Sequence, residues 1–396
     1  MKNNSYYLAY PGKRDADSIL QETRPAATKE VKTYGMQNLT LENWSNRLIL
    51  GDNLPVMKTL LGDPMVRGCV SLVYIDPPFS KNQVFRIGDT RTSTVSSSIH
   101  DDEAYHDVRI GHDYLEFMRE RLIFLRELLS DNGTIYVHID WMKGHYIKVI
   151  MDEVFGEEHF LNDIARVKCN PKNFERRAFG NIKDIVLIYS KTDDYTWHEP
   201  REKMTEEAIR RLFPKVDEQG RRYTTNPLHA PGETLNGPTG RPWRGILPPK
   251  GRHWRYPPNK LEELDRKGLI EWSSKGNPRK IIYADERRPE KKMQDIWEFK
   301  DPAYPDYPTE KNLRMLELIV NTSSNKNGLV LDCFAGSGTT LVAAERLGRR
   351  WIGIDDSPRA IDMAVRRLTS LRKCRRFTLC RSDSQTLQEV LEQQRA

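Results

Sequence analysis

The 396-residue sequence lacks several features that define whole classes of protein. It has no apolar run long enough to cross a bilayer, which argues against a membrane-spanning protein. Its first seven residues lack the apolar core of a signal peptide, and its five cysteines form no Cys-x-x-Cys pair. We therefore expect a cytoplasmic location, no membrane partner, no disulfide framework and no metal site.

A short glycine-containing segment lacks the features of two common phosphate-binding loops. The apolar run 329–331 leads into Asp332-Cys333-Phe334-Ala335-Gly336-Ser337-Gly338-Thr339-Thr340. No Gly-Lys-Ser/Thr ending is present, which excludes a P-loop, and Leu341 stands where a dinucleotide-binding loop has its third glycine. The segment therefore favours a nucleoside cofactor without a pyrophosphate, and S-adenosylmethionine fits best.

The residues after this segment support a cofactor site. A helix is predicted over 339–347 and a strand over 350–354, which ends at Asp355. That acidic residue lies roughly 20 residues past the glycines, where a carboxylate binds both hydroxyls of a ribose. We expect Asp355 to have this role.

A second segment, Asp76-Pro77-Pro78-Phe79, follows the apolar run 70–75. The carboxylate of Asp76 and the carbonyl of Pro77 are suited to accept both N–H bonds of an exocyclic base amine, which would direct its lone pair outward. The two prolines fix φ and stiffen the corner, and Phe79 offers a ring for base stacking. A base in a duplex reaches such a corner only after it has been flipped out of the stack.

Both segments follow predicted strands, and the ligand crevice of an open α/β sheet lies beyond the carboxyl ends of its strands. We therefore expect the two segments to share one crevice, although most of the chain separates them. Strands and helices alternate on both sides of residues 195–300, which predicts an α/β fold with a doubly wound, mostly parallel sheet formed by the N-terminal and C-terminal halves.

Residues 201–300 break the alternation and carry most of the excess positive charge. They contain 23 Lys/Arg and 15 Asp/Glu, a net charge of +8, whereas the whole chain has +7. Basic residues that concentrate in one unit indicate a polyanionic partner there. The densest part alternates basic and aromatic residues, and its candidate DNA-binding residues are Arg241, Trp243, Arg244, Arg252, His253, Trp254 and Arg255.

The two motifs, in this order, resemble the β class of S-adenosylmethionine-dependent DNA amino-methyltransferases over about 48–371. The resemblance implies a Rossmann-like methyltransferase fold and catalytic roles for Asp76, Pro77, Pro78 and Phe79. It also assigns residues 307–312 to the family's His-Pro-Thr-Gln-Lys-Pro segment, although Tyr, Glu and Asn replace three of those six residues. The implied cofactor-binding residues are Asp52, Thr309, Lys311, Asp332, Phe334, Ala335, Gly336, Ser337, Gly338, Thr339 and Asp355.

The predicted elements and the resemblance together lead us to expect four parts, with a dimer contact as the alternative for the first. These are an N-terminal arm (1–40), a catalytic half (41–194), a target-recognition region (195–300) and a cofactor-binding half (301–396). The polar stretch 80–111 within the catalytic half predicts a mobile loop that closes over DNA, with plain disorder as the alternative.

We predict a site-specific enzyme of a restriction-modification type that methylates N6 of a flipped-out adenine in double-stranded DNA. In the resembled family, Asp at the head of the catalytic tetrapeptide is commoner for adenine and Ser for cytosine. Cytosine N4 methylation is the alternative, followed by RNA adenine methylation and by a DNA-binding protein without catalysis. A homodimer and a separate restriction endonuclease are further expected partners, and no residue names an interface for either.

Overall fold

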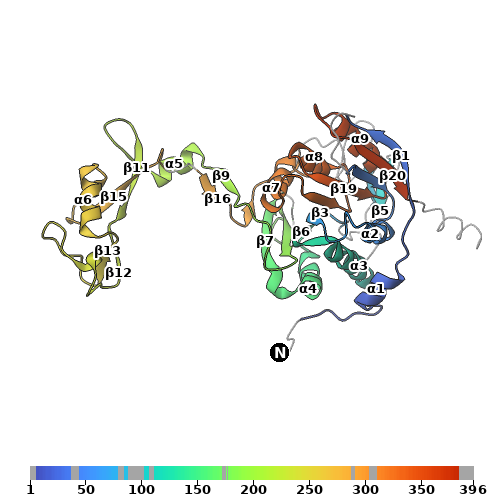
Figure 1. Cartoon of the computed structure of the whole chain (residues 1–396), viewed down its shortest axis with the longest axis horizontal. Coiled ribbons are helices and arrows are strands. Elements are labelled where there is room, and N and C mark those ends of the chain that lie inside the picture. Colours follow the sequence, from blue (N-terminus) through green and yellow to red (C-terminus); the bar gives the residue numbers. More distant parts are fainter. Residues whose placement is uncertain are drawn as a thin grey trace, which may run out of the picture. The chain divides into compact units, whose positions relative to one another are not determined.

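The computed structural model describes residues 6–36, 44–78, 111–171, 175, 177–286, 290–302 and 310–382, and the backbone of 84–87 and 102–106. Contacts divide the chain into two compact units. The first comprises Met1–Glu199 with Gln294–Ala396, and the second is Pro200–Met293. Figure 1 shows the elements of both. None of the described helices is both long enough and apolar enough to span a bilayer.

The first unit is built on one large sheet. Among the described residues its strand order is β1 (Thr28–Tyr34), β20 (Phe377–Ser382), β2 (Asn46–Leu50), β19 (Arg350–Asp355), β18 (Leu329–Asp332), β3 (Val70–Ile75), β6 (Leu129–Ile139), β8 (Lys183–Ser190), β7 (Phe160–Val167) and β17 (Ile296–Trp297). All neighbours from β20 to β6 are parallel, whereas β8 is antiparallel to both β6 and β7. The prediction of a mostly parallel sheet completed by both halves of the chain is confirmed.

Helices cover the two faces of this sheet (Figure 1). One set comprises α1 (Ala16–Glu22), α2 (Asn53–Leu61), α3 (His112–Leu128), α4 (Gly144–Phe155) and the short η1 (Glu157–His159). The other set comprises α7 (Leu313–Ser323), α8 (Thr339–Arg346) and α9 (Pro358–Thr369). Because both faces are covered, the central strands are buried on both sides, which explains the continuous apolar runs in β3 and β18.

The winding of the chain reverses between β18 and β3, which are hydrogen-bonded neighbours. From β3 the chain crosses through α3 to β6, whereas from β18 it crosses through α8 to β19 on the other side. Such a reversal opens a crevice at the carboxyl ends of the two strands. The ends of these strands carry Asp76 and Asp332.

The helix α3 ends at Leu128, and Asn132 and Gly133 lie within β6. The polar stretch 80–111 contains two antiparallel strands, β4 (Val84–Ile87) and β5 (Asp102–His106). Most of that stretch lies outside the described residues, so its role as a lid stays a prediction.

The second unit has its own small core. Its sheet has the order β10 (Lys215–Val216), β11 (Arg222–Pro227), β15 (Pro278–Tyr283) and β14 (Ile270–Trp272). The other elements are the strand pairs β12 (His229–Pro231) with β13 (Arg252–Trp254) and β9 (Arg201–Lys203) with β16 (Glu290–Lys292), and the helices α5 (Glu206–Leu212), η2 (Pro238–Gly240) and α6 (Pro258–Arg266). Leu228, Trp243, Trp254, Leu261 and Leu264 pack together as a buried cluster.

Candidate active site

A cavity of about 260 Å³ lies at the crevice between β18 and β3. The predicted site residues that line it are Asp52, Asp76, Pro77, Pro78, Lys311, Asp332, Phe334, Ala335, Gly336, Ser337, Thr339 and Asp355. The two segments predicted to share one crevice therefore do so. Gly338 lies beside the cavity in the same loop, whereas Phe79 and Thr309 lie outside the described residues.

Asp76 lines this cavity, and its two carboxylate oxygens differ in their partners. Its Oδ2 forms an ion pair with the ammonium group of Lys311. Its Oδ1 is buried and has no hydrogen-bond partner within the described part of the chain. A buried acceptor without a donor is costly, so this oxygen is prepared to accept a hydrogen bond from a ligand.

The glycine loop approaches the cavity closely because two of its residues adopt left-handed backbone conformations. Gly336 has φ +50° and its N–H donates to Asp355 Oδ2 over 2.7 Å. Apart from its chain neighbours, none of the described residues has an atom within 4 Å of the position that a Cβ on Gly336 would take, so the space above its Cα is open to them. Gly338 has φ +77°, and a Cβ there would come within 2.8 Å of Ala364 on α9. Glycine at both positions keeps the loop close to α9 and open toward the cavity.

Two carboxyl groups, of the buried Asp332 and the half-buried Asp355, make this part of the cavity acidic. Burial raises the pKa of Asp332 to about 7, although the backbone N–H of Phe334 donates to it. Burial also raises the pKa of Asp355 to about 6, against the opposing effect of the N–H groups of Ser357 and Gly336. Both groups would be stabilised in their ionised form by a cation or by hydroxyl donors.

A hydrogen-bond network on α2 and α3 connects the acidic end of β2 to the glycine loop. Asp52 caps α2, accepting from the N–H of Leu54, and also accepts from Arg121 Nη2 over 3.1 Å. Arg121 Nε donates to Asn53 Oδ1 over 2.6 Å, and Asn53 Nδ2 donates to the carbonyl of Cys333 over 2.7 Å. The carboxylate of Asp52 is therefore held in place at the cavity.

Sequence reasoning missed several of the residues that line the cavity, namely Asn53, Tyr74, Phe117, Arg121 and Glu310. The guanidinium group of Arg121 lies 3.5 Å from the centre of the Phe117 ring. Both side chains come from α3, where the apolar spacing indicated only a helix with a buried face. The one signal available in the sequence was Arg121, a basic residue within one turn of the apolar Met118 and Leu122. An arginine on the buried face of a helix requires a partner.

His138 belongs to a buried polar network behind the cavity. Its ring has no exposed surface, and its two nitrogens lie 2.9 Å from Tyr74 Oη and 3.3 Å from Asp184 Oδ2. Burial is the main cause of its lowered pKa. Among the described residues, no group of three or more His, Cys, Asp or Glu side chains is arranged to hold a metal ion.

The second unit corrects part of the predicted DNA-binding set. Trp243 is 2% exposed and Trp254 is 0% exposed, and both belong to the core of this unit. Their indole N–H groups donate to Glu262 and to the carbonyl of Arg241. The prediction that these rings contact DNA is wrong, because the alternating basic and aromatic pattern reflects a strand and loop with one buried side.

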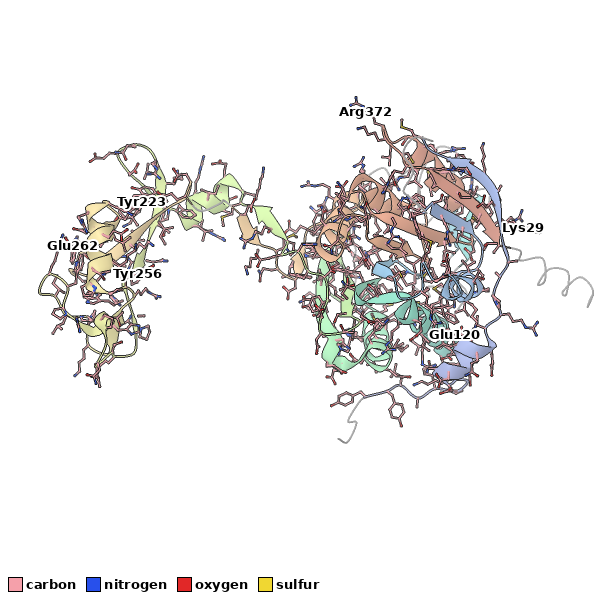
Figure 2. All side chains as sticks on the ribbon, viewed as in Figure 1. Lys29, Glu120, Tyr223, Tyr256, Glu262 and Arg372 are labelled. Atoms are coloured by element: carbon pink, nitrogen blue, oxygen red, sulfur yellow. The ribbon has the colours of Figure 1, made fainter. Side chains whose placement is uncertain are left out.

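Arg244 also differs from the expectation of a free phosphate-binding cation. Its guanidinium pairs with Glu262 over 2.7 Å and with Asp265 over 2.7 Å, both on α6. Figure 2 shows Glu262 on this helix. The local sequence contains no acidic residue, and α6 supplies two from outside it. The charge of Arg244 is therefore largely compensated within the protein.

The other candidate residues, Arg241, Arg252, His253 and Arg255, have exposed or half-exposed side chains. Arg252 Nη1 lies 3.1 Å from His229 Nδ1, and Arg255 Nε donates to the carbonyl of Pro227. Burial lowers the pKa of His229, and the charges of Arg252, Arg255 and Arg279 lower it further. The positive charges of three arginines therefore lie close enough to act on one imidazole, and Arg252 contacts it.

Comparisons with known proteins identify the family of this chain. A family model described as DNA methylase (N6_N4_Mtase) matches residues 70–366, which include both the Asp76 corner and the glycine loop. The chain belongs to the DNA methylase family. The prediction of a DNA methyltransferase is thereby confirmed.

Individual relatives of this DNA methylase include proteins of two restriction-modification types. This chain is 40% identical over 367 residues to the type II methyltransferase M.EcaI of Enterobacter cloacae, and the alignment covers 91% of this chain and 77% of that protein. It is 24% identical over 409 residues to the Mod subunit of the type III enzyme EcoP15I of Escherichia coli, covering 86% of this chain and 62% of the subunit.

The methylase also resembles the crystal structure of M1.HpyAVI with SAM. The identity is 17% and the TM-score is 0.42, over 81% of this chain and 100% of the other. This TM-score is too low to support a residue-by-residue correspondence.

Proposed function

We propose that this DNA methylase transfers the methyl group of S-adenosylmethionine to N6 of an adenine flipped out of duplex DNA. The observation that carries the proposal is the buried Oδ1 of Asp76, which has no partner among the described residues and belongs to a side chain that lines the same cavity as the glycine loop. An N–H donor on the ligand would satisfy this oxygen.

The cavity residues fit S-adenosylmethionine in three respects. Asp355 accepts from Gly336 and lies where the ribose hydroxyls would donate. Asp332 and Asp355 have raised pKa values, and a cationic ligand would stabilise both carboxyl groups in their ionised form. The open space above Gly336 admits a ligand against the backbone. When bound, S-adenosylmethionine supplies an electrophilic methyl group.

Asp76 and Pro77 would hold the target amine for transfer. Asp76 Oδ1 accepts one N–H of the amine, and the carbonyl of Pro77 accepts the other. Both bonds draw the hydrogens out of the base plane and direct the nitrogen lone pair toward the methyl group. Hydrogen bonds to a carboxylate are stronger than those between neutral groups, so Asp76 is the main orienting group. The stacking role of Phe79 stays a prediction.

The assignment of adenine rests on the aspartate that begins the Asp-Pro-Pro-Phe motif. Cytosine N4 presents the same pair of N–H donors, and the geometry of Asp76 suits it equally. It is therefore the second candidate.

The second unit is proposed as the target-recognition region. Its support is the cluster of Arg252, Arg255 and Arg279 around His229, which offers positive charge to the phosphates of DNA. The names of the relatives support a place in a restriction-modification system. A separate endonuclease partner, a homodimer and a cytoplasmic location stay predictions.

The proposal is tested by expression in a host that lacks adenine methylation, followed by base-modification sequencing of its DNA. N6-methyladenine at one recurring motif is the expected result. Detection of N4-methylcytosine would instead support the second candidate, methylation of cytosine N4. The matched control is Asp76→Asn, which keeps the size of the side chain and removes its charge, and which we expect to leave the DNA unmodified. An unmodified host with a wild-type protein that binds S-adenosylmethionine would contradict the proposal.

A further inference from the structure

Two consecutive residues, Glu310 and Lys311, contact different parts of the active site. Lys311 forms an ion pair with Asp76 Oδ2, and the two side chains are 9% and 17% exposed. Glu310 Oε1 lies 2.9 Å from Arg367 Nη2, and these side chains are 12% and 17% exposed. Both Glu310 and Lys311 line the cavity. One short segment therefore carries two mostly buried ion pairs.

Arg367 extends this connection to the glycine loop. Its Nη1 donates to the carbonyl of Ser337 over 3.2 Å, to Ser337 Oγ over 2.8 Å and to Thr339 Oγ1 over 2.8 Å. Arg367 comes from α9 and is not itself part of the cavity lining. One guanidinium group thus holds the glycine loop on one side and Glu310 on the other.

These contacts form a continuous chain from the cofactor loop to the catalytic carboxylate. The order is Ser337 and Thr339, then Arg367, Glu310, Lys311 and finally Asp76. Partly buried ion pairs are sensitive to loss of one partner, because the remaining charge is left uncompensated. A displacement at the glycine loop would therefore be transmitted to the residue that holds Asp76.

We propose that Arg367 and Glu310 are positioning residues that couple the cofactor loop to the target-base site through Lys311. The proposal rests on the proposed function. Arg367 fixes Glu310 relative to the glycine loop, and this fixes Lys311 beside it. Lys311 then occupies Asp76 Oδ2, so that Oδ1 alone is presented to the base amine. The resembled family has glutamine at the position of Glu310. The acidic residue in this chain is explained by its ion pair with Arg367.

The test measures transfer of tritiated methyl groups from S-adenosylmethionine to unmethylated plasmid DNA carrying the mapped target motif. Because Glu310→Gln keeps the size of the side chain and all bonds from Arg367 to the glycine loop, we expect kcat to fall about tenfold with KM for S-adenosylmethionine nearly unchanged. Because Arg367→Gln also releases Ser337 and Thr339, we expect it to lower kcat and raise KM together. The matched control is Arg366→Gln, the exposed neighbour on α9, which should leave both constants unchanged.

A double-mutant cycle separates coupling from two independent effects. If Glu310 acts only through Arg367 and Lys311, the double variant Glu310→Gln/Arg367→Gln should lose no more kcat than Arg367→Gln alone. Lys311→Met should reproduce the kcat defect, and Lys311→Arg should restore part of it by keeping the charge. Should a variant fail to fold, Arg367→Lys retains the charge but not the forked geometry, and a lowered kcat is expected there too.

The outcomes distinguish this inference from the proposed function. An unchanged kcat in Glu310→Gln, or fully multiplicative losses in the double variant, would overturn the coupling. Absence of methyl transfer by the wild-type protein, with S-adenosylmethionine bound, would instead overturn the proposed function.

Discussion

Asp355, at the carboxyl end of β19, accepts a hydrogen bond of 2.7 Å from the backbone N–H of Gly336 in the loop after β18. Two adjacent parallel strands are thereby joined at the point where the cofactor would lie. The same carboxylate caps the turn before α9 by accepting from the N–H of Ser357. Asp355 also lines the cavity, so its charge state should control cofactor binding.

We expect Asp355→Asn to weaken binding of S-adenosylmethionine by roughly 10- to 100-fold, since each hydrogen bond to a charged group contributes about 1.5–3 kcal/mol. Burial raises the pKa of this carboxyl to about 6. Donation from ribose hydroxyls favours the ionised form, so wild-type affinity should decline as the pH falls below 6. Isothermal titration calorimetry between pH 5 and 8 measures both effects. An affinity in Asp355→Asn equal to that of the wild type would exclude the ribose role.

Asp332 provides a test of stability against pH. Burial raises the pKa of its carboxyl group from the ordinary value of 3.8 to about 7. The folded protein therefore binds a proton that the unfolded chain has released between about pH 4 and 7, and the contribution of Asp332 to stability is lost as the pH rises through 7. We expect Asp332→Asn to unfold at a higher temperature than the wild type at pH 8, with a smaller difference at pH 5. Thermal unfolding without cofactor measures this, and equal differences at both pH values would contradict the shift.

Substitution of Asp76 should abolish methyl transfer and leave cofactor binding nearly unchanged. Asp76→Ala removes the acceptor for the target amine, so methyl transfer should fall below detection. Asp355 and the glycine loop remain, so the dissociation constant for S-adenosylmethionine should change little. Filter-based methyl transfer and calorimetry on the same preparation measure the two quantities. A large loss of cofactor affinity would place Asp76 in the cofactor site instead.

The basic cluster of the second unit should determine the salt dependence of DNA binding. Each phosphate contact contributes about 0.9 to the slope of log affinity against log salt concentration. We expect Arg252→Gln/Arg255→Gln to reduce that slope by about 2. Arg244→Gln is the control, because its charge is already paired with Glu262 and Asp265 and its loss should leave the slope unchanged. Fluorescence anisotropy at several salt concentrations provides the slopes; equal slopes for the wild type and the double variant would exclude phosphate contacts.

We expect the Trp254 side chain to stabilise the fold of the second unit and not to contact DNA. Its ring is fully buried with Leu228, Leu261 and Leu264. Trp254→Ala should lower the free energy of unfolding of the second unit by about 3–5 kcal/mol, because it leaves a large cavity. Denaturant unfolding followed by hydrogen exchange in residues 200–293 measures it. A stable variant with impaired DNA binding would restore a direct role for the ring.

The sequence by itself determined the fold class and the two ends of the site. Apolar runs that lead into Asp76 and Asp332 place both residues at strand ends, and the carboxyl ends of parallel strands meet at one edge of a sheet. Asp355 followed from its spacing to the glycines. These inferences succeed because strand alternation, helix spacing and left-handed glycines are local properties of the chain.

Only the tertiary structure decided which side chains meet. Lys311 reaches Asp76 across 235 residues of sequence, and Arg367 reaches Glu310 from α9. The same basic and aromatic segment contains Trp254 in a core, Arg244 in ion pairs and Arg252 at the surface, and no local pattern distinguishes them. Burial and charge pairing depend on residues that are distant along the chain, so spacing predicted where the site lies and packing decided how its charges are arranged.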